Sequence, residues 1–505
     1  MSGTQSRSAF NLTEIPSDYR VPGTYVQVGA DYSQAGLFDY PARALIVGQM
    51  LASGAATSGQ IYKLESATQA IWLFGPGSMA ARMAAAFRTA NPTMPVDIVG
   101  LSDAAAGAAA TGPITVARIP VTSGEIVLPI AGQSVSVDFN VATITTTTQL
   151  ASAIAAAINA VASLPVTATS AAAVVTLTAK HKGAAGNDIA YQTPSWPATG
   201  ALNELNITGS STGSPTSLLS GGTSNPSIST VFAAVAGTWY TDIVMGWADA
   251  ANLAALSTEA DRRYGAMVHQ DATAYVAGQG TYGTLPTLNS AVNGKNITGP
   301  GETAMLSPPW EVAASYAGIA AAALNDDPAR QLRGLTLPGI VPADPYDRFT
   351  PDERNAMLHD GWSTLTTAND NTVAIERAIS MYLTTNFGYA DTAWLDINKS
   401  KVMSRIRYDF RAYMDTVWPR AKLTDDGSMA SEYDSTIATP TRLKASWIAR
   451  SAIYERNGWI EESATWGQQA LFERDPNNDD GVLAKLPVKI VGNLITLEVA
   501  LNFMV

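Results

Sequence analysis

The chain has 505 residues, of which 46% are hydrophobic and 15% are charged, and its formal net charge is −12. This length favours two to four domains over one compact core. The acidic balance argues against direct binding of nucleic acid phosphates. The sequence has no cysteine, which excludes disulfides, thiolate metal sites and cysteine nucleophiles. The low charge predicts a surface partly covered by partners.

Membrane insertion and secretion are not expected. Residues 1–20 contain no apolar segment of the kind that a secretory signal needs. The longest weakly polar run, residues 312–324, is Ala-rich and too short to span a bilayer. We expect it to form a buried helix.

Residues 1–33 are predicted to form an N-terminal arm. Pro16, Pro22 and Gly23 punctuate it, which is typical of irregular chain. Val26 and Val28 then place two branched side chains on one face of a short extended piece.

Residues 34–110 are predicted to be the first part of an α/β core. Residues 44–47 form a continuous apolar run, the kind of strand that is buried on both faces. Residues 75–78 open a helix in which Met79, Met83 and Phe87 recur on one face. Residues 96–99 are the next strand, and strand–helix–strand is the start of a parallel sheet.

Residues 111–222 are predicted to be an inserted, mostly β domain. Alternating apolar residues at 126–130 and 135–139 indicate a hairpin, and residues 174–179 indicate a further strand. One helix interrupts this pattern, with apolar residues on one face between Leu150 and Val161. Residues 209–226 have the Ser, Gly, Thr and Pro content of a linker.

The α/β pattern then resumes over residues 223–385. Residues 242–245 and 265–268 are predicted strands on either side of a helix at 252–264. Thr350 begins a helix, because Pro follows it and Glu stands three residues later.

Residues 386–487 are predicted to be an α+β region with one long helix. Apolar residues spaced four, four, three and four apart run from Val402 to Val417, and Pro419 ends the helix. The densest basic stretch lies on it, with acidic residues interleaved, so we interpret it as a solvated or subunit-facing side and not a DNA site. Its members are Arg405, Arg407, Arg411, Arg420 and Lys422, with Asp409 and Asp415 between them.

Residues 488–505 are predicted to form a C-terminal β arm. Its odd positions are apolar: Ile495, Leu497, Val499, Leu501, Phe503 and Val505. Residues 492–493 can serve as a hairpin turn before it. Burial of six such side chains contributes roughly 10 kcal/mol before ordering entropy is subtracted. The strand must therefore pair, either within its own chain or with a neighbour.

No catalytic, cofactor or metal site is predicted. The three histidines, His181, His269 and His359, stand far apart, and His181 lies in a basic turn. Residues 209–213 read GxSxG but lie in the linker, without the strand and helix that a hydrolase nucleophile needs. Asp242, His269 and a later serine occur in the order of a subtilisin-type catalytic triad, but nothing in the local sequence supports that assignment.

Two further motifs also have simpler interpretations. Residues 75–78 lack the GK[ST] of a phosphate-binding loop, so we expect a plain helix N-terminus. Asp475, Asn477 and Asp479 are spaced like the first ligands of a calcium loop, but the Gly and the distal Glu are misplaced or missing. A polar turn is expected there.

Several stretches, in this order, resemble Mu-like phage tail sheath proteins. They are residues 10–25 (FNLTEIPSDYRVPGTY), 45–49 (LIVGQ), 74–78 (FGPGS), 181–183 with 186–187 (HKG, GN), 350–355 (TPDERN) and 370–372 (DNT). Each motif is weak alone, but together they span nearly the whole chain.

The resemblance implies an α/β domain of the type described as subtilisin-like, a mixed sheet with helices, without a protease triad. It also implies that the N- and C-terminal arms reach into neighbouring subunits and complete a shared sheet. Val26, Val28 and the odd-numbered residues from Ile495 to Val505 would then be the inter-subunit strands. The inserted domain would project outward.

The function implied is that of a structural subunit of a contractile tail sheath. Its expected partners are other copies of itself, the tail tube protein, and the baseplate and tail terminator proteins. It would be a virion component assembled in the host bacterial cytoplasm, with no cofactor. The alternatives are the sheath of a tailocin or secretion machine, a hydrolase on the same scaffold, and a cell-surface or capsid protein.

Overall fold

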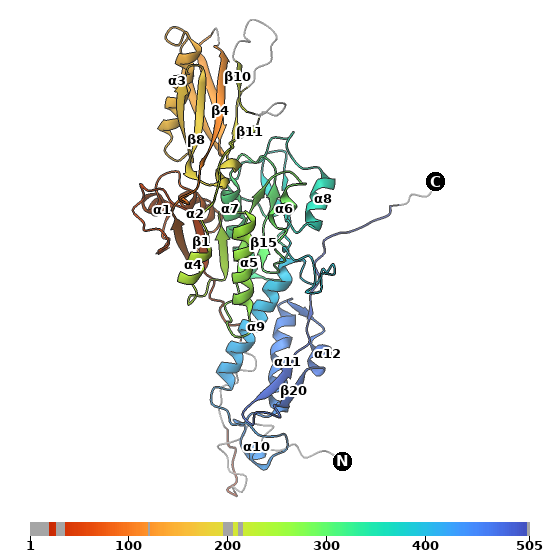
Figure 1. The fold of residues 1–505 in the computed structure, drawn as a ribbon. Helices are drawn as coiled ribbons and strands as arrows, with labels where there is room; N and C mark the ends of the chain where they lie inside the picture. The colour runs from red at the N-terminus through yellow and green to blue at the C-terminus, as the bar shows by residue number, and fades with distance from the viewer. Residues whose placement is uncertain (1–19, 27–35, 120–121, 195–205, 211–215, 502–505) are drawn as a thin grey trace, which may run out of the picture. The chain divides into compact units, whose positions relative to one another are not determined.

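The structure is a computed structural model that describes residues 20–26, 36–119, 122–194, 206–210 and 216–501. It divides into two compact units (Figure 1). We call residues 41–400 the central unit, and residues 1–40 with 401–505 the terminal unit.

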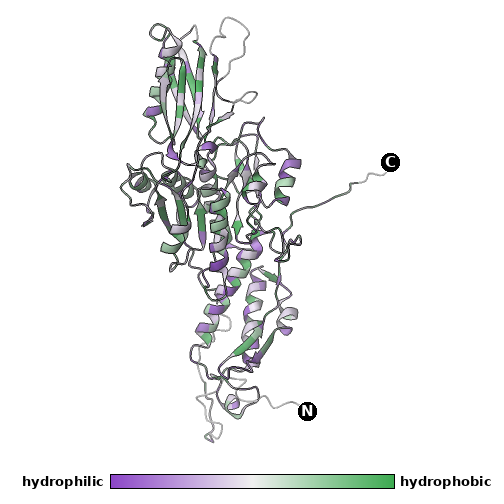
Figure 2. Ribbon diagram, in the orientation of Figure 1, coloured by the Kyte–Doolittle hydropathy of each residue, from purple (hydrophilic) through white to green (hydrophobic). Residues whose placement is uncertain are grey.

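The core of the central unit is a six-stranded mixed sheet. Its order is β15-β13-β12-β1-β3-β2, and every neighbouring pair is parallel except β2 with β3. The strands are β1 (Ala44–Gln49), β2 (Ile61–Lys63), β3 (Val96–Leu101), β12 (Asp242–Met245), β13 (Thr273–Tyr275) and β15 (Ile297–Thr298). All six residues of β1 are buried, as the continuous apolar run predicted. The hydropathy of each residue is mapped on the ribbon in Figure 2.

Helices cover this sheet through their apolar faces. They include α1 (Ala67–Phe74), α2 (Met79–Ala90), α5 (Ala250–Tyr264) and α7 (Pro309–Asp326). Met79, Met83 and Phe87 of α2 are buried, which confirms the predicted face. Gly318 lets α2 and α7 pack closely, because a Cβ there would lie 2.7 Å from the Cβ of Ala90. α7 contains the Ala-rich run that was predicted to be a buried helix.

Between β3 and β12 the described residues form two four-stranded antiparallel sheets, and α3 packs against them. One sheet has the order β10-β4-β8-β7 and the other β11-β9-β5-β6. The elements are β4 (Ala109–Arg118), β5 (Gly124–Ile130), β6 (Gln133–Phe139), α3 (Thr147–Ala160), β7 (Val166–Ala171), β8 (Val174–Lys182), β9 (Ala190–Gln192), β10 (Asn206–Thr208) and β11 (Thr216–Leu218). The predicted hairpin is β5–β6, and Ala131 and Gly132 turn it with positive φ values of 49° and 74°.

The remainder of the central unit consists of short elements around the sheet. They are a 3₁₀ helix (Ala184–Asp188), α4 (Ser229–Ala234), β14 (Gly278–Gln279), α6 (Leu285–Leu288), β16 (Gly301–Glu302), α8 (Pro351–His359), β17 (Thr364–Thr367) and β18 (Val373–Arg377). α8 begins with the predicted capping box, in which Thr350 and Glu353 each accept a hydrogen bond from the other's backbone N–H.

The terminal unit is built on two long helices. α9 (Ile397–Val417) begins in the central unit and continues into the terminal unit, and its length confirms the predicted helix. The other elements are α10 (Met429–Tyr433), α11 (Pro440–Arg456), β19 (Ile460–Glu461), α12 (Ser463–Gln468), β20 (Leu471–Arg474), β21 (Val482–Lys485) and β22 (Lys489–Ile490). β20 pairs only with β21, and β19 only with β22, among the residues described.

The predicted strand at residues 265–268 is wrong. α5 ends at Tyr264, and a turn follows in which the N–H groups of Val268 and His269 both donate to the carbonyl of Gly265. Met267 is 91% exposed, so this segment has no core to face. The next strand of the sheet is β13, where buried residues pair with β12 and β15.

None of the helices in the described ranges is both long and apolar enough to cross a bilayer.

The buried carboxyl of Glu302 predicts a pH dependence of stability. Burial raises the pKa of Glu302 to about 8, against the opposing effect of a hydrogen bond from the backbone of Leu365. Unfolding therefore releases a proton between the ordinary glutamate pKa and about 8, so stability falls as pH rises through this window. We expect Glu302→Gln, which stays neutral, to unfold at least about 2 °C higher than the wild type at pH 9.

The same variant should match the wild type at pH 4, where both side chains are neutral. Thermal denaturation followed by circular dichroism at the two pH values measures this difference. The exposed Glu432 supplies a control, because Glu432→Gln should leave the melting temperature unchanged at both. An equal effect of Glu302→Gln at pH 4 and pH 9 would contradict the assignment.

Candidate functional site

The predicted inter-subunit residues that the structure describes lie mostly exposed. Val26 is 79% exposed and lies outside any strand. Leu497, Val499 and Leu501 are 77%, 73% and 93% exposed, and Ile495 is half-buried. Val28, Phe503 and Val505 lie outside the described residues.

The described part of the predicted C-terminal strand, and the turn before it, have no regular structure in the single chain. Residues 491–501 have neither strand nor turn structure. A strand needs a hydrogen-bonded neighbour and a surface on which to bury its apolar face, and no strand of the chain is paired with this segment in the described residues. Within residues 491–501 the alternation in the sequence therefore does not produce a strand in the single chain.

The same unit contains a two-stranded sheet with open edges. β20 and β21 pair antiparallel, with Leu471 opposite Lys485 and Glu473 opposite Leu483. Leu471 is 53% exposed and Leu483 is 55% exposed. An isolated hairpin of this kind is marginal in water, and unpaired strand edges accept further strands. Sequence analysis did not identify this hairpin.

The root of the N-terminal arm is held by a buried ion pair. Asp409 of α9 accepts two 2.6 Å hydrogen bonds from the guanidinium of Arg450 in α11. Their side chains are 3% and 0% exposed. The backbone N–H of Phe38 donates to Asp409 at 2.8 Å, and Arg450 donates to the carbonyl of Gly36 at 3.0 Å. Both partners therefore bind the arm as well as each other.

This arrangement corrects the interpretation of the basic stretch on α9. Asp409 is 2% exposed and Arg405 is 8% exposed, so neither belongs to a solvated or subunit-facing side. The guanidinium of Arg405 lies 4.5 Å from the ring centre of Tyr40. The prediction is wrong for these two residues, because the partner helix α11 was not recognised; Thr439 followed by Pro440 is the start signal that identifies it. The other members of the stretch are exposed, as predicted, or half-buried: Arg407, Arg411, Asp415, Arg420 and Lys422.

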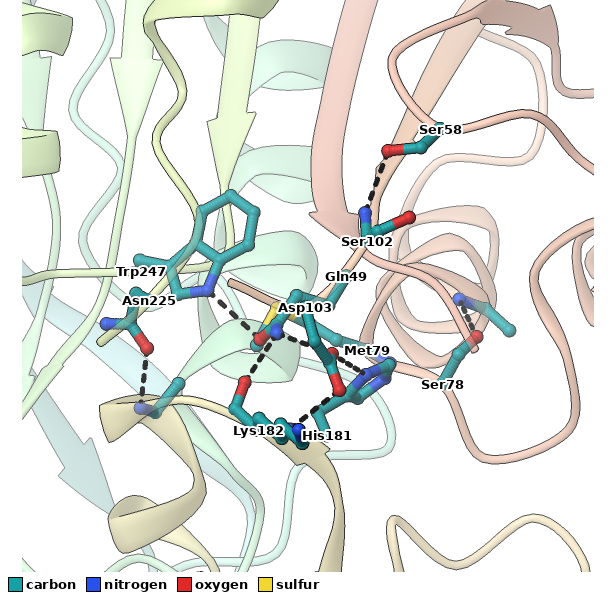
Figure 3. Close-up of polar contacts among 12 residues, drawn as sticks. Gln49, Ser58, Ser78, Met79, Ser102, Asp103, His181, Lys182, Asn225 and Trp247 are labelled. Atoms are coloured by element: carbon teal, nitrogen blue, oxygen red, sulfur yellow. Dashed lines mark hydrogen bonds and ion pairs between the residues drawn. The ribbon is translucent and has the colours of Figure 1, made fainter. Parts of the chain in front are cut away.

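A second polar cluster lies at the carboxyl ends of β1, β3 and β12 (Figure 3). The chain leaves β1 toward β3 on one side and returns to β12 on the other, and such switch points form the usual ligand crevice of open α/β sheets. Here the amide of Gln49 donates to Asp103 at 3.0 Å and to the carbonyl of Lys182 at 2.7 Å. The indole N–H of Trp247 donates to the amide oxygen of Gln49 at 3.3 Å.

The end of β8 therefore fills the crevice. The N–H of Lys182 donates to Asp103 at 3.0 Å, and Nδ1 of His181 lies 3.1 Å from the same carboxylate. Nε2 of His181 accepts from the N–H of Met79 at 3.1 Å, so the proton of the neutral ring is on Nδ1. The predicted basic turn at His181 is wrong: His181 is 8% exposed and lies within β8.

This contact also settles the interpretation of residues 75–78. The first N–H groups of α2 are already bonded, to His181 at Met79 and to the hydroxyl of Ser78 at Ala81. Residues 75–78 are a plain helix start, as predicted. Sequence analysis missed Gln49 and Asp103, although each directly follows or ends a buried strand.

The expected linker between residues 209 and 226 is partly ordered. Asn187 donates to the carbonyl of Gly222 and accepts from its N–H, at 3.0 and 2.7 Å. Ala108 and Thr223 form a bridge, and Thr111 and Ser220 another. Residues 211–215 lie outside the described residues. The described part is therefore an edge strand and its continuation, because its backbone finds partners that composition does not reveal.

The remaining candidate motifs are occupied by structural contacts. Asp242 accepts from the hydroxyls of Thr241 and Tyr275, at 2.6 and 3.0 Å. His269 follows α5 with a φ of 55°, and His359 ends α8. Residues 475–481 form a turn closed by a hydrogen bond from Asp475 N–H to the Gly481 carbonyl. No group of three or more His, Asp or Glu in the described part of the chain is placed to hold a metal ion.

The Asp103 cluster predicts a pH-dependent contribution to stability. Burial raises the pKa of Asp103, but the hydrogen bonds from His181, Lys182 and Gln49 outweigh it and hold the pKa below its usual value. A depressed carboxyl pKa stabilises the fold above the unfolded pKa and loses this effect as pH falls through the folded value. Asp103→Asn should cost about 1–3 kcal/mol at pH 7 and progressively less toward pH 3.

Urea unfolding of the full chain at pH 7 and pH 3 measures the difference, provided that the wild type is folded at both. Asp138→Asn is the matched control, because Asp138 lies exposed on β6. A loss for Asp103→Asn that is the same at both pH values would contradict the ionised cluster.

Comparison with known proteins finds similarity to phage tail sheath proteins. Residues 221–381 match the model of the phage tail sheath protein central domain. The chain is 28% identical over 474 residues to the Mu-like prophage FluMu tail sheath protein of Haemophilus influenzae, covering 93% of this chain and 94% of that protein.

Solved structures of low identity are also similar over most of the chain. One is a sheath tail protein from Desulfitobacterium hafniense, with a TM-score of 0.48 and 13% identity, covering 93% of this chain and 97% of that one. Another is the helical sheath of the anti-feeding prophage in its contracted state, with a TM-score of 0.48 and 10% identity, covering 96% and 99%. Residues 221–381 are thus similar to the central domain of phage tail sheath proteins, and the similarity to a Mu-like tail sheath protein extends over nearly the whole chain.

Proposed function

We propose that this chain is the repeating subunit of a contractile tail sheath, which polymerises helically around a tail tube and contracts to drive the tube through the host envelope. The proposal rests on one observation, which is that two features occur together in the terminal unit. Leu497, Val499 and Leu501 form an exposed apolar row, and the β20–β21 hairpin has open edges.

These two features are complementary. An extended segment adds to an open sheet edge through main-chain hydrogen bonds, and its alternate side chains bury on one face. The C-terminal segment of one copy has the alternation, and the β20–β21 hairpin of a neighbouring copy has the edge. Leu471 and Leu483 add apolar surface to that hairpin. The N-terminal arm, with Val26 and Val28, is proposed to contribute in the same way.

The energy for contraction would come from interfaces between subunits. On this proposal the sheath is built in an extended state of higher free energy, and subunits rotate and slide as nearly rigid bodies while the arms keep them connected. The two compact units, each with its own buried polar cluster, suit rigid-body movement. No nucleotide or cofactor is needed, and ATP-dependent contraction of purified extended sheath would contradict the proposal.

The partners of this function are proposed in the same terms. They are other copies of the chain, the tail tube protein, the baseplate and the tail terminator, without direct contact with nucleic acid and without membrane insertion. We propose a virion location after assembly in the host cytoplasm. The domain division given above, with residues 111–222 facing outward and a subtilisin-like core, is also a proposal; the mostly parallel sheet with covering helices supports it.

Two alternatives have distinct tests. A sheath from a tailocin or secretion machine would share every feature described here, and genome neighbourhood distinguishes it. A hydrolase on the same scaffold would be labelled stoichiometrically at one serine by a fluorophosphonate probe. The filled crevice at Gln49 and Asp103 argues against this second alternative, because the usual ligand position of the sheet is taken by the chain itself.

A truncation tests self-assembly through the C-terminal segment. Negative-stain electron microscopy of the purified full chain should reveal hollow tubes, and a truncation ending at Pro487 should give none, because the donated strand is missing. Tubes from both would keep the sheath function and remove this account of the segment. Dispersed particles from both, even with tail tube protein added, would contradict the sheath function.

A point variant tests the one-sided burial of the donated strand. Val499→Glu places a charge on the apolar row and should reduce tube formation at least about tenfold in sedimentation assays, since burying an unpaired carboxylate is strongly unfavourable. Ala500→Glu is the matched control on the opposite side of the strand and should assemble normally. Equal effects of the two variants would rule out a strand with one buried face.

A further inference from the structure

The C-terminal segment, like the N-terminal one, has a defined root in the terminal unit. β22 pairs with β19, so that Ile490 lies opposite Ile460 and Lys489 opposite Glu461. Directly after β22, the N–H of Val491 donates to the carbonyl of Trp459 at 3.2 Å. Trp459 is therefore one of the residues that hold the start of the C-terminal segment, beside Ile460 and Glu461.

One side chain joins this root to the buried ion pair. The hydroxyl of Tyr454 donates to Asp409 at 2.7 Å, on the carboxylate that also holds Phe38 and Arg450. The ring of Tyr454 stacks on Trp459 with a centroid distance of 5.9 Å and an angle of 10°. Burial raises the pKa of Tyr454, so the phenol remains a donor.

A second connection runs beside the first. The guanidinium of Arg405 lies 4.5 Å from the ring centre of Tyr40 and 5.5 Å from that of Trp459. Tyr40 packs edge-on against Tyr408 of α9 at 5.4 Å. The two chain ends, more than 400 residues apart in sequence, thus meet through two independent sets of contacts in one cluster.

We propose that this cluster, formed by Arg405, Asp409, Arg450, Tyr454 and Trp459, couples the two arms, so that displacement of one arm at its root changes how firmly the other is held. The inference rests on the proposed function for the role of the arms, but the coupling itself is a property of the single chain. In a sheath, each subunit would pass a load from the strand it donates at one end to the strand it donates at the other.

The physical reason is that no member of the cluster can shift independently. The carboxylate of Asp409 accepts four hydrogen bonds from Phe38, Arg450 and Tyr454, all within the terminal unit. Loss of any of these donors would leave a buried charge with too few hydrogen bonds. Movement of Phe38 changes the hydrogen bonding of the carboxylate, and Tyr454 must follow it. Because the Tyr454 ring lies flat on Trp459, this movement reaches the residue that binds Val491.

Amide hydrogen exchange of the full-length, unassembled chain tests the coupling. Phe38→Ala removes the ring that lies 5.3 Å from the Arg450 guanidinium, at the N-terminal root. It should raise exchange over residues 489–492, at the other root, by about threefold or more. In reverse, Lys489→Ala removes the ion pairs with Glu461 and Glu462 and should raise exchange over residues 36–40.

Tyr454→Leu serves as the uncoupling variant. In that background, Phe38→Ala should add less exchange at residues 489–492 than it does in the wild type, because only the connection through Arg405 remains. The matched control is Arg263→Lys, which weakens a different buried ion pair, with Glu259 in the central unit, and should leave both roots unchanged. If Phe38→Ala loosens the unit as a whole, the milder Phe38→Leu replaces it, with the same expected pattern.

The proposal is overturned if Phe38→Ala changes exchange only at residues 36–40, or if Arg263→Lys raises exchange at both roots equally. Because the measurement uses unassembled chain, its outcome is separate from that of the proposed function. Absence of tubes from the wild type would remove the sheath function without altering the measured coupling. Normal tubes with no coupling would remove only the inference made here.

Discussion

The central unit depends on finding hydrogen-bond partners for polar groups that end its most buried strand. β1 has strands on both sides and helices on its face, so Gln49 at its end is 1% exposed and must be satisfied within the protein. It is satisfied by Asp103 after β3, Lys182 at the end of β8 and Trp247 after β12. One amide thereby fixes the end of the added β-sheets against the main sheet, and the crevice that other α/β proteins keep for ligands is closed.

In the terminal unit, the buried polar groups that need partners are charged. Asp409 and Arg450 are as deeply buried as the amide of Gln49, and each is satisfied partly by backbone of the arm near Gly36 and Phe38. The ion pair of Asp409 and Arg450 is not strong evidence of stability, since the cost of desolvating the two charges offsets most of their attraction. The Gln49 cluster and the Asp409–Arg450 pair instead favour one conformation over others. Removing one partner of either set leaves the other buried without a hydrogen bond, so each region is held in a single arrangement.

Regular elements were predictable wherever a helix or strand carries its own pattern. The apolar run of β1, the one-sided repeat of α2 and the capping box of α8 were identified correctly, because local sequence decides them. Contacts between distant residues were not. His181 looked like a turn residue because its partners Asp103 and Met79 are far away in sequence, and Arg405 looked solvated because α11 was not recognised. The C-terminal alternation remains a prediction, because on the function proposed its partner lies in another subunit and the described residues 491–501 contain no strand.

The lack of helix and strand over residues 491–501, after β22, also has a kinetic consequence for the sheath we propose. A segment without regular structure loses backbone freedom when it docks, which costs roughly 1–2 kcal/mol for each residue fixed. Two isolated subunits meeting in solution would bear that cost for a single contact. A subunit arriving at a completed ring would meet several sites at once, and the later contacts would form at high effective concentration. Growth from an existing end would then be fast while spontaneous initiation stays slow, which restricts polymerisation to places where a template already stands.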